Sequence, residues 1–313
     1  MAETKLPMAI SVVIPTRNRA DRLRQAIDSA RRQTLSPLEI IVVDDASSDE
    51  TPHLLASIDD TRLRVIRVER QRGASHARNQ GIGAARGSLL ALLDDDDRWL
   101  PEKLSIQSAA LAAAPEQVGL ICCAYHVVSD RGGRVVKTWQ PPDKVMDVRY
   151  FLRTTGFMTT VPLIRASCLA AVGGFDEHLA GGQDLDLWIR IAERFQVAAV
   201  PEVLAEHRIH GDQITTNLPL KARASAQILR KHRERLAAYP ELLARHLERA
   251  ALLHCAAGDS DTGRAYLAEV IALTPAPDAP RAHLAHSLRD PAAHAALLRA
   301  HGFRRVDGMT LFY

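Results

Sequence analysis

The sequence predicts an α/β fold with a mixed, mostly parallel sheet, followed by a region made of helices. Short β-branched apolar runs alternate with amphipathic segments between residues 9 and 94. This alternation is typical of a parallel sheet that carries helices on both faces. From about residue 218 the chain is rich in Ala, Leu, Arg and His, and its amphipathic pattern predicts an all-α region.

Four short apolar runs provide the predicted strands. Residues 9–16 form a β-branched run that Pro15 stops, and residues 38–51 begin with a buried run that leads into two aspartates. The alternating run 63–69 and the apolar run 88–94 follow. All four are expected in one sheet.

Helices are expected between these strands. Residues 20–34 place apolar side chains at helical spacing. The short helix that follows the second strand can take its N-cap from Ser48 or Asp49. Residues 73–87 are rich in small side chains and predict a helix that Gly87 closes.

Composition excludes several classes of protein. With 313 residues the chain can bury the core of one large domain plus a smaller one. The net charge of +3 and the lack of a Lys/Arg block argue against nucleic acid. The 4 cysteines have no metal-ligand spacing, and neither a signal peptide nor a membrane span is evident. We expect a cytoplasmic protein, with any membrane contact peripheral.

Polar clusters stand directly after three predicted strands: residues 15–18, Asp44 with Asp45, and Asp94–Asp97. Ligands of open α/β sheets bind at the carboxyl ends of the strands, so these clusters should converge. Crowded carboxylates need a counter-charge, and a divalent cation shared with substrate phosphates is the usual one. The alternative is a solvated acidic turn. No P-loop or G-x-G-x-x-G sequence is present, so side chains must help to neutralise the phosphates.

Six blocks, taken in order, resemble family 2 glycosyltransferases of the GT-A fold. The resemblance covers about residues 8–217, which we expect to form the GT-A domain, with residues 218–313 as the helical region. The blocks are ISVVIPTRNRADRL, IIVVDDASSDET, RGASHARNQGIGAARG, LLALLDDDDRW, VGGFDEHLAGGQDLDLWIRI and HRIHGDQIT.

The resemblance implies roles in binding a nucleotide-diphosphate sugar. Asp45 matches the aspartate that reads the nucleotide base, and Pro15 and Arg17 match positions that wall the base site. The planar guanidinium of Arg17 can stack on the base. Arg78 is expected to help to neutralise the diphosphate.

The acidic run contains the family's DxD motif. The resemblance implies that Asp96 binds the metal, Mn²⁺ or Mg²⁺, that bridges the donor diphosphate. His210 matches a loop histidine that binds the metal or the diphosphate, and His207 is the alternative.

The alignment of the DxD motif with the four identical residues Asp94–Asp97 can shift by one position. Asp94 or Asp95 would hold the ribose or a metal-bound water. Asp97 would cap the helix expected around residues 101–111.

Asp184 matches the family's general base, which takes the proton of the acceptor hydroxyl. This chain has Gln183 where the family often has Glu. Asp186 is the competing carboxylate, and both acids also suit the start of a helix. Trp188, in the same helix, is expected in the core.

The resemblance implies an inverting, metal-dependent transferase that adds one sugar or a few. No Q-x-x-R-W sequence, found in the family's processive polymerases, follows the base. A UDP-sugar is the first expectation for the donor, with GDP and dTDP open. The acceptor would be a carbohydrate or glycolipid of bacterial surface polysaccharide or glycoconjugate synthesis. The alternatives are a catalytically idle GT-A-like module acting through its helical tail and a sugar nucleotidyltransferase, although the glycine-rich loop of the latter is missing.

The helical region contains a segment, AALLHCAAGDSDTGRAYLAEVIALTP, that resembles a tetratricopeptide-like hairpin. One such hairpin cannot bury its own apolar face. It is expected to pack on the catalytic domain, on a second hairpin in residues 280–301, or on another subunit as a homo-oligomer. Docking of an acceptor carrier or a protein partner is the alternative.

Overall fold

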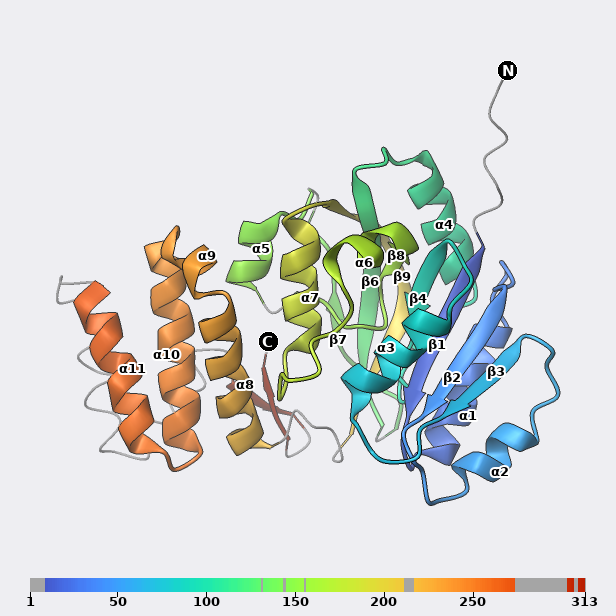
Figure 1. The fold of residues 1–313 in the computed structure, drawn as a ribbon, viewed down its shortest axis with the longest axis horizontal. Helices are drawn as coiled ribbons and strands as arrows, with labels where there is room; N and C mark the ends of the chain where they lie inside the picture. Colours follow the sequence, from blue (N-terminus) through green and yellow to red (C-terminus); the bar gives the residue numbers. More distant parts are fainter. Residues whose placement is uncertain are drawn as a thin grey trace. The chain divides into compact units, whose positions relative to one another are not determined.

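Figure 1 shows the computed structural model of the chain, which divides into two compact units. The first unit comprises Met1–Glu177 and Asp184–His210, and the second comprises His178–Gln183 and Gly211–Tyr313. The structure describes residues 9–130, 132–142, 145–154, 156–210, 217–273, 303–306 and 309–312.

In the described residues, the first unit is built on one mixed sheet of nine strands: β1 (Ile10–Thr16), β2 (Glu39–Asp44), β3 (Leu63–Arg67), β4 (Leu89–Leu92), β5 (Arg98–Trp99), β6 (Val118–Ser129), β7 (Val135–Trp139), β8 (Leu163–Arg165) and β9 (Gln196–Ile209). Their order is β3-β2-β1-β4-β8-β6-β9-β5, and β7 pairs with β6. The first four strands are parallel, as predicted.

Strand direction brings several carboxyl ends to one edge of the sheet. β8 is antiparallel to both β4 and β6, so β6 runs parallel to β4. β9 is parallel to β6. The carboxyl ends of β1, β2, β4, β6 and β9 therefore all point to the same edge, where ligands of such sheets bind.

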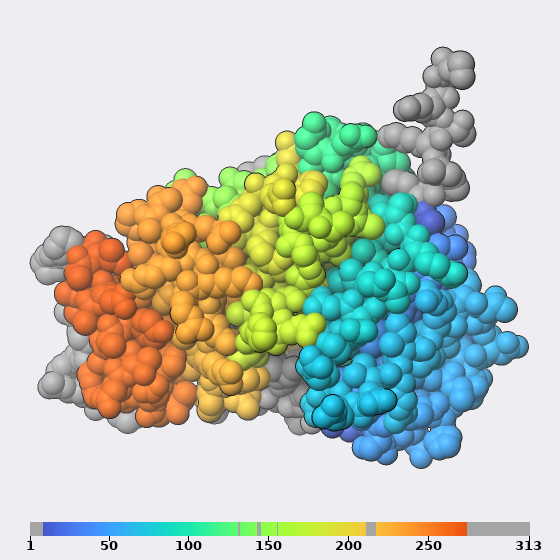
Figure 2. Space-filling model, viewed as in Figure 1, coloured from blue at the N-terminus to red at the C-terminus, as the bar shows by residue number. Residues whose placement is uncertain are grey.

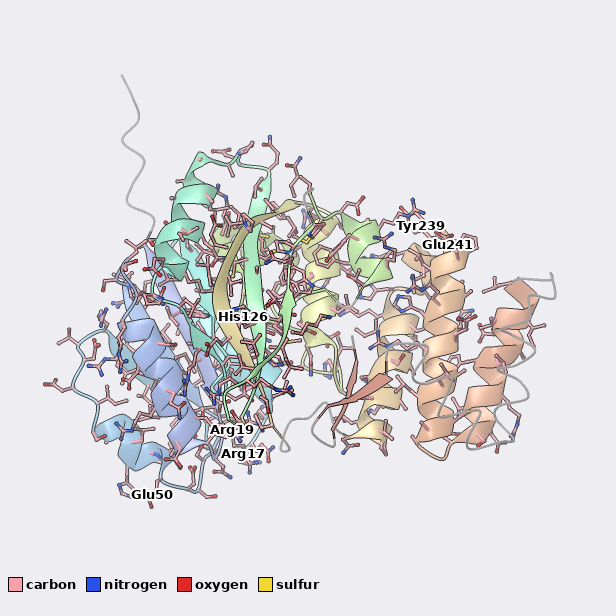
Figure 3. The ribbon with its side chains drawn as sticks, turned by 180° about the vertical axis from the view of Figure 1, so that it is seen from behind. Arg17, Arg19, Glu50, His126, Tyr239 and Glu241 are labelled. Atoms are coloured by element: carbon pink, nitrogen blue, oxygen red, sulfur yellow. The ribbon has the colours of Figure 1, made fainter. Side chains whose placement is uncertain are left out.

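Helices cover both faces of this sheet: α1 (Ala20–Arg31), α2 (Thr51–Ala56), α3 (Ala74–Ala84), α4 (Lys103–Ala113), α5 (Val148–Arg153), α6 (Ala166–Val172) and α7 (Gln183–Ala192). α3 lies in front of the sheet in Figure 1, and α1 lies on the face seen from behind in Figure 3. α1 buries the apolar stripe that its spacing predicts, formed by Leu23, Ala26, Ile27 and Ala30.

Two local predictions need correction. The first strand does not stop at Pro15 but continues to Thr16. The missing N–H of Pro15 faces the β4 side, where pairing has already ended at Val13. Gly87 does not close α3, because the helix ends at Ala84 with an extended cap. Gly87 instead lets the chain pass close to β1, since a Cβ there would lie 2.6 Å from the backbone nitrogen of Ser11.

Residues 218–273 of the second unit are helical, as predicted, but the region is not all-α, because a strand pair follows: α8 (Leu218–Lys231), α9 (Arg233–Ala237), α10 (Pro240–Ala256) and α11 (Ser260–Leu273). α10 and α11 pack through Ala251, Leu252 and Leu267, with Tyr266 against this cluster. The chain ends in a short antiparallel pair, β10 (Phe303–Val306) with β11 (Met309–Phe312), for which the sequence showed no pattern. The second hairpin expected in residues 280–301 lies outside the described residues.

Candidate active site

The four consecutive aspartates after β4 occupy four different environments. Asp95 and Asp97 are buried, with 5% and 1% of their surface exposed, and Asp94 and Asp96 are partly exposed. Each carboxylate has a cationic side chain within contact distance. These partners offset the repulsion that adjacent negative charges create.

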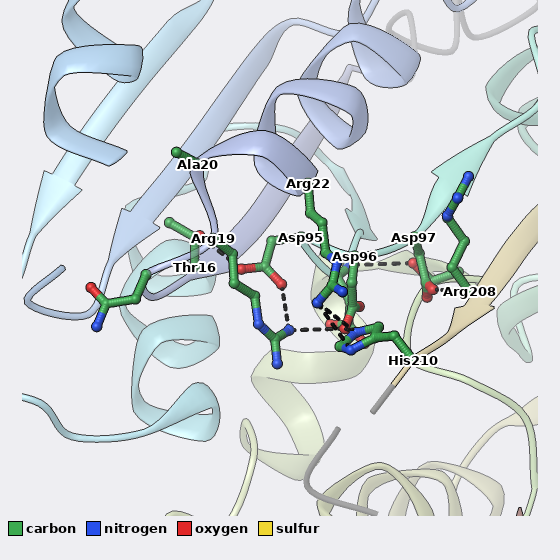
Figure 4. A network of polar contacts seen from close by, with 12 residues as sticks. Thr16, Arg19, Ala20, Arg22, Asp95, Asp96, Asp97, Arg208 and His210 are labelled. Carbon is green, nitrogen blue, oxygen red and sulfur yellow. Dashed lines mark hydrogen bonds and ion pairs between the residues drawn. The ribbon is translucent and has the colours of Figure 1, made fainter. Parts of the chain in front are cut away.

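Arg19 bridges two of these carboxylates (Figure 4). Its Nη1 lies 2.9 Å from Asp95 Oδ1 and 2.8 Å from Asp96 Oδ2, and the Thr16 hydroxyl donates to Asp95 at 2.7 Å. Burial and the charge of Asp96 raise the pKa of Asp95 to about 6. Burial opposes ionisation of Asp96 too, but the hydrogen bond from His210 and the charge of Arg19 prevail and lower the pKa of Asp96. Asp96 is thus held as a carboxylate, the form that a metal ligand must have.

His210 follows β9 and brings its ring to Asp96. Its Nε2 lies 2.9 Å from Asp96 Oδ2, and Arg22 Nη1 lies 2.9 Å from its Nδ1. The histidine is buried, with 5% of its surface exposed. Arg22 and Arg208 also share the carboxylate of Asp130. The two residues predicted as metal ligands therefore meet, although they lie 114 positions apart in the chain.

Asp97 does not cap the next helix, contrary to the prediction. α4 begins at Lys103 with Glu102 as its N-cap residue, and no side chain caps it. Asp97 Oδ1 instead contacts His207 Nδ1 and accepts from the Arg208 N–H, both at 3.0 Å. Burial raises the pKa of Asp97 to about 6, and the charge of Asp97 outweighs burial to raise the pKa of His207 to about 9. This buried ion pair joins the acidic run to β9.

Arg78 reaches the acidic run from α3. Its Nη2 donates to Asp94 Oδ1 at 2.6 Å, and its guanidinium carbon lies 5.3 Å from the centre of the Phe175 ring. The next residue, Asn79, exchanges hydrogen bonds with the backbone of Phe175 and also donates to Glu177. In Figure 2 the cyan surface of α3 adjoins the yellow-green loop that follows α6. Arg78 is thus fixed between Asp94 and this loop.

Asp184 and Asp186 lie at the start of α7 and differ in their surroundings. Asp186 is fully buried and accepts from Arg190 Nε and Nη2, both at 2.9 Å. Arg190 also donates to the carbonyls of Val172 and Gly174. Asp186 therefore organises the turn after α6.

Asp184 is only half-buried, and the Leu185 N–H donates to its carboxylate at 2.8 Å. Burial raises the pKa of Asp184, as does the charge of Asp94, while the Leu185 N–H and the positive charge of Arg78 lower it. The carboxylate that suits proton transfer is therefore Asp184, close enough to Arg78 and Asp94 to feel their charges. Trp188 is fully buried and donates to the Phe157 carbonyl, which confirms its prediction as a core residue.

The predicted base-reading residues lie at the ends of β1 and β2. Asp45 is buried, and its two oxygens accept the N–H groups of Arg72 and Gly73, both at 2.8 Å. It thereby fixes the loop that leads into α3, although each of its oxygens has a further lone pair. Pro15 is buried in β1, whereas Arg17 is exposed and lies near Arg19 in Figure 3.

The loops after β1 and β2 interlock. The Asn18 N–H donates to the Ser47 hydroxyl, and the Ser48 N–H donates to the Asn18 side chain. Asn18 and Ala46 both have a positive φ, 53° and 58°. Non-glycine residues rarely adopt this conformation, and such strain tends to occur at functional sites. The predicted base site is thus rigid and strained.

The donor set fits a divalent cation only in part. Asp96 and His210 supply a carboxylate oxygen and an imidazole nitrogen, which Mn²⁺ accepts. Among the described residues, no group of three or more His, Cys, Asp or Glu side chains is placed to hold a metal ion. Two protein ligands are nevertheless the usual number where substrate phosphates complete the coordination.

Sequence reasoning missed Arg19 and Arg22, which supply the counter-charge to Asp95, Asp96 and Asp130. Arg19 is the N-cap residue of α1 and Arg22 lies in its first turn, so both stand at the N-terminal end of the helix. The position of these arginines directly after the first strand could have predicted their role. It was overlooked because the base-site residue Arg17 lies in the same short run.

Comparison with known proteins settles the family. The family model described as Glycosyl transferase family 2 matches residues 11–171. The chain belongs to this family. An uncharacterized glycosyltransferase of Rickettsia prowazekii, RP339, is 32% identical over 215 residues, which cover 67% of each chain.

Two bacterial relatives carry names from polysaccharide synthesis. The succinoglycan biosynthesis protein ExoO of Rhizobium meliloti is 43% identical over 111 residues, 36% of this chain and 32% of ExoO. The chain thus matches only about a third of ExoO. The putative colanic acid biosynthesis glycosyl transferase WcaA of Escherichia coli is 28% identical over 72% of this chain and 82% of WcaA.

Solved structures confirm the GT-A fold. The structure of S. aureus TarS 1-349 in complex with UDP-GlcNAc has a TM-score of 0.64 at 18% identity, covering 98% of this chain and 97% of that one. The mannosyltransferase PcManGT of Pyrobaculum calidifontis has a TM-score of 0.55 at 23% identity and covers 93% and 85%. In the described residues, no helix is long and apolar enough to cross a membrane.

Proposed function

We propose that this family 2 protein is a metal-dependent, inverting glycosyltransferase. It transfers a sugar from a nucleotide-diphosphate sugar to a hydroxyl group of an acceptor. The observation that carries the proposal is the convergence of Asp94–Asp97, His210 and three arginines at the carboxyl edge of the sheet, beside Asp184.

Donor binding divides between two parts of this edge. Pro15, Arg17 and Asp45 stand at the ends of β1 and β2 and would surround the base. The guanidinium of Arg17 is exposed and available for stacking. Asp94 or Asp95 would hold the ribose, which would require one of them to exchange its arginine partner for a sugar hydroxyl.

Asp96 and His210 would hold the divalent metal, together with oxygens of the donor diphosphate. When bound, Mn²⁺ or Mg²⁺ supplies a Lewis acid that stabilises charge on the leaving diphosphate. Arg78, Arg19 and Arg22 add positive charge around the same position. Arg19 lies in ion-pair contact with both Asp95 and Asp96, which supports a place for positive charge there.

Asp184 acts as the general base. Inverting transfer is a single displacement in which the acceptor oxygen attacks the anomeric carbon opposite the departing diphosphate. Because an alcohol has a pKa far above 7, its proton must leave as the new bond forms, and a positioned carboxylate can take it. The raised pKa of Asp184 makes it a better proton acceptor than an ordinary aspartate.

A UDP-sugar is the first candidate donor. The names of relatives include UDP-Glc for WfgD of Escherichia coli and UDP-GlcNAc for TarS, while PcManGT is described with GDP-Man and Mn²⁺. The names of ExoO and WcaA suggest an acceptor in bacterial surface polysaccharide or glycolipid synthesis. We place the protein in the cytoplasm, with peripheral membrane contact when the acceptor is a lipid.

An idle GT-A-like module acting through α8–α11 is the second candidate. A helical hairpin is an element suited to protein contacts, including contacts with a second copy of this chain. Against it stands the complete set of Asp45, Asp96 and Asp184, at least one of which a degenerate module would be expected to have lost.

The test is calorimetric titration of the protein with UDP, GDP and dTDP, with Mn²⁺ present and then with EDTA. We expect one nucleotide to bind in Mn²⁺ and to lose most of its affinity in EDTA. Asp96→Ala should behave like the EDTA sample, while Asp97→Asn, which lies beside it but faces His207, should keep metal-dependent binding if it folds. Failure of all three nucleotides to bind would favour the idle module.

A further inference from the structure

The tryptophan at the end of β7 is more exposed than the other tryptophans of the chain. The chain has 3 tryptophans. Trp99 and Trp188 are 4% and 0% exposed, whereas Trp139 is only half-buried. Trp139 stacks on the ring of Tyr125, with centroids 5.3 Å apart and an angle of 23° between the rings. Part of the Trp139 ring thus remains in contact with solvent, while Tyr125 behind it is buried, with 5% of its surface exposed.

This aromatic pair lies on the same sheet face as His207. Tyr125 pairs with Trp139 on β7 and with Ala205 on β9, and His207 stands two residues beyond Ala205 on the same face. His207 holds Asp97 of the acidic run. His126, labelled in Figure 3, points to the opposite face, where it contacts Thr138.

A row of rings connects Trp139 with the helix of the general base. Phe157 lies 6.1 Å from Trp139 and 5.0 Å from Trp188, measured between ring centres. Trp188 follows Asp184 by one helical turn on α7. Burial raises the pKa of Tyr125, and the charges of Asp97 and Asp184 add to the effect, so both carboxylates lie within electrostatic reach of its hydroxyl.

The position of the Trp139–Tyr125 pair excludes the nucleotide base as its ligand. The predicted base site is at the ends of β1 and β2, and β6 is four strands away from β2 in the sheet order. Four strand spacings of about 4.8 Å amount to about 19 Å. The aromatic pair is therefore separated from the predicted base site by several strands.

We propose that Trp139, supported from behind by Tyr125, forms the wall of an acceptor subsite, on which one face of a pyranose ring stacks with a hydroxyl directed to Asp184. A pyranose presents C–H groups on one face, and the face of an aromatic ring is electron-rich, so the two attract each other beyond simple burial. The Tyr125 hydroxyl and the Asp184 carboxylate supply polar partners for the sugar's hydroxyls. The inference rests on the proposed transfer reaction, since Asp184 is its general base.

Tryptophan fluorescence tests the subsite without turnover. Because Trp99 and Trp188 are buried, acrylamide should quench mainly Trp139. The probes are methyl β-glycosides of glucose, galactose and N-acetylglucosamine, added with UDP and Mn²⁺, with open-chain sorbitol as the non-cyclic control. We expect at least one pyranoside to protect the wild-type protein from quenching, and sorbitol not to do so.

Variants on the two faces of β7 complete the test. Trp139→Ala should weaken binding of the protecting pyranoside about tenfold or more in calorimetry, and Trp139→Phe should weaken it less. Thr138→Ala, on the opposite face, should bind it like wild type. Unchanged binding in Trp139→Ala, or no protection by any of the pyranosides while the nucleotide binds, would overturn the subsite. Loss of nucleotide binding in the wild-type protein would instead refute the proposed donor chemistry.

Discussion

Asp184 and Asp186 lie two positions apart on α7, and changing each to asparagine should have opposite consequences. Asp184→Asn removes a proton acceptor from the reaction. General acid–base catalysis contributes about 10²–10⁴-fold to enzyme rates, so we expect kcat to fall by about that factor. Stability should not fall, because the raised pKa of Asp184 means that folding disfavours its charged form. A neutral side chain of the same size removes this unfavourable term.

Asp186→Asn breaks a buried ion pair instead. Asp186 is 0% exposed and Arg190 has 17% of its side chain exposed, so the guanidinium would lose its counter-charge in a mostly dry environment. Removing one partner of a buried pair costs about 3–5 kcal/mol. Because Arg190 keeps its carbonyl partners and asparagine can still accept one hydrogen bond, we expect about 3 kcal/mol. At about 2–4 °C per kcal/mol, the melting temperature should fall by about 6–12 °C.

The assay is paired. Thermal unfolding of both variants gives the stability change, and calorimetry with the nucleotide and Mn²⁺ shows whether the donor site survives. Turnover is then measured at a temperature where both variants are folded. Wild-type turnover in Asp184→Asn, or a folded Asp186→Asn of unchanged stability that has lost turnover, would reverse the roles assigned to the two carboxylates.

Three further predictions follow from the site and the sheet. Since Asp184 must be ionised to accept a proton and its pKa is raised, kcat should fall on the acid side with a midpoint above the ordinary aspartate value of 3.8; a pH profile without this limb would argue against Asp184. His210→Ala should weaken Mn²⁺ binding, measured by titration in the presence of the nucleotide, while an exposed-residue control such as Glu50→Ala should not; equal affinities would remove His210 from the metal site. Gly87→Ala should destabilise the fold by about 3 kcal/mol, because its Cβ would meet the backbone of β1. Gly83 has open space around it, so Gly83→Ala should stabilise α3 by about 0.5–1 kcal/mol in the same unfolding measurement. Similar effects of the two substitutions would contradict this account.

Local pattern was sufficient for β1 to β4 and the helices between them, because each of these elements carries its own signal; β5 to β9 were not predicted from the sequence. The β-branched runs of β1 and β2 and the Leu-rich run of β4 are buried on both faces and therefore form continuous apolar strands. The apolar stripe of α1 has the helical period. The direction of parallel strands then places their carboxyl ends at one edge, so the meeting of polar clusters at that edge could also be predicted.

The same reasoning failed where a side chain has several partners within reach. Asp97 stands close before a helix and suits an N-cap, yet it pairs with His207, which lies 110 positions later. Gly87 suits a helix end, yet it serves the close passage of the chain against Ser11. A capping contact is local and modest in energy, so a buried charge partner from a distant strand outweighs it.

By itself the sequence determined the order of the first four strands and the helices between them, the edge of the sheet that carries the site, and the residue types gathered there. Only the tertiary structure decided which of them touch. It separated Asp184 from Asp186 by their burial and partners, set Arg19 across Asp95 and Asp96, and placed Trp139 beside Tyr125 on the same sheet face as His207. The physical reason is that backbone periodicity is a local property of the chain, whereas hydrogen bonds, ion pairs and ring contacts depend on side chains that the packed sheet brings together from distant segments.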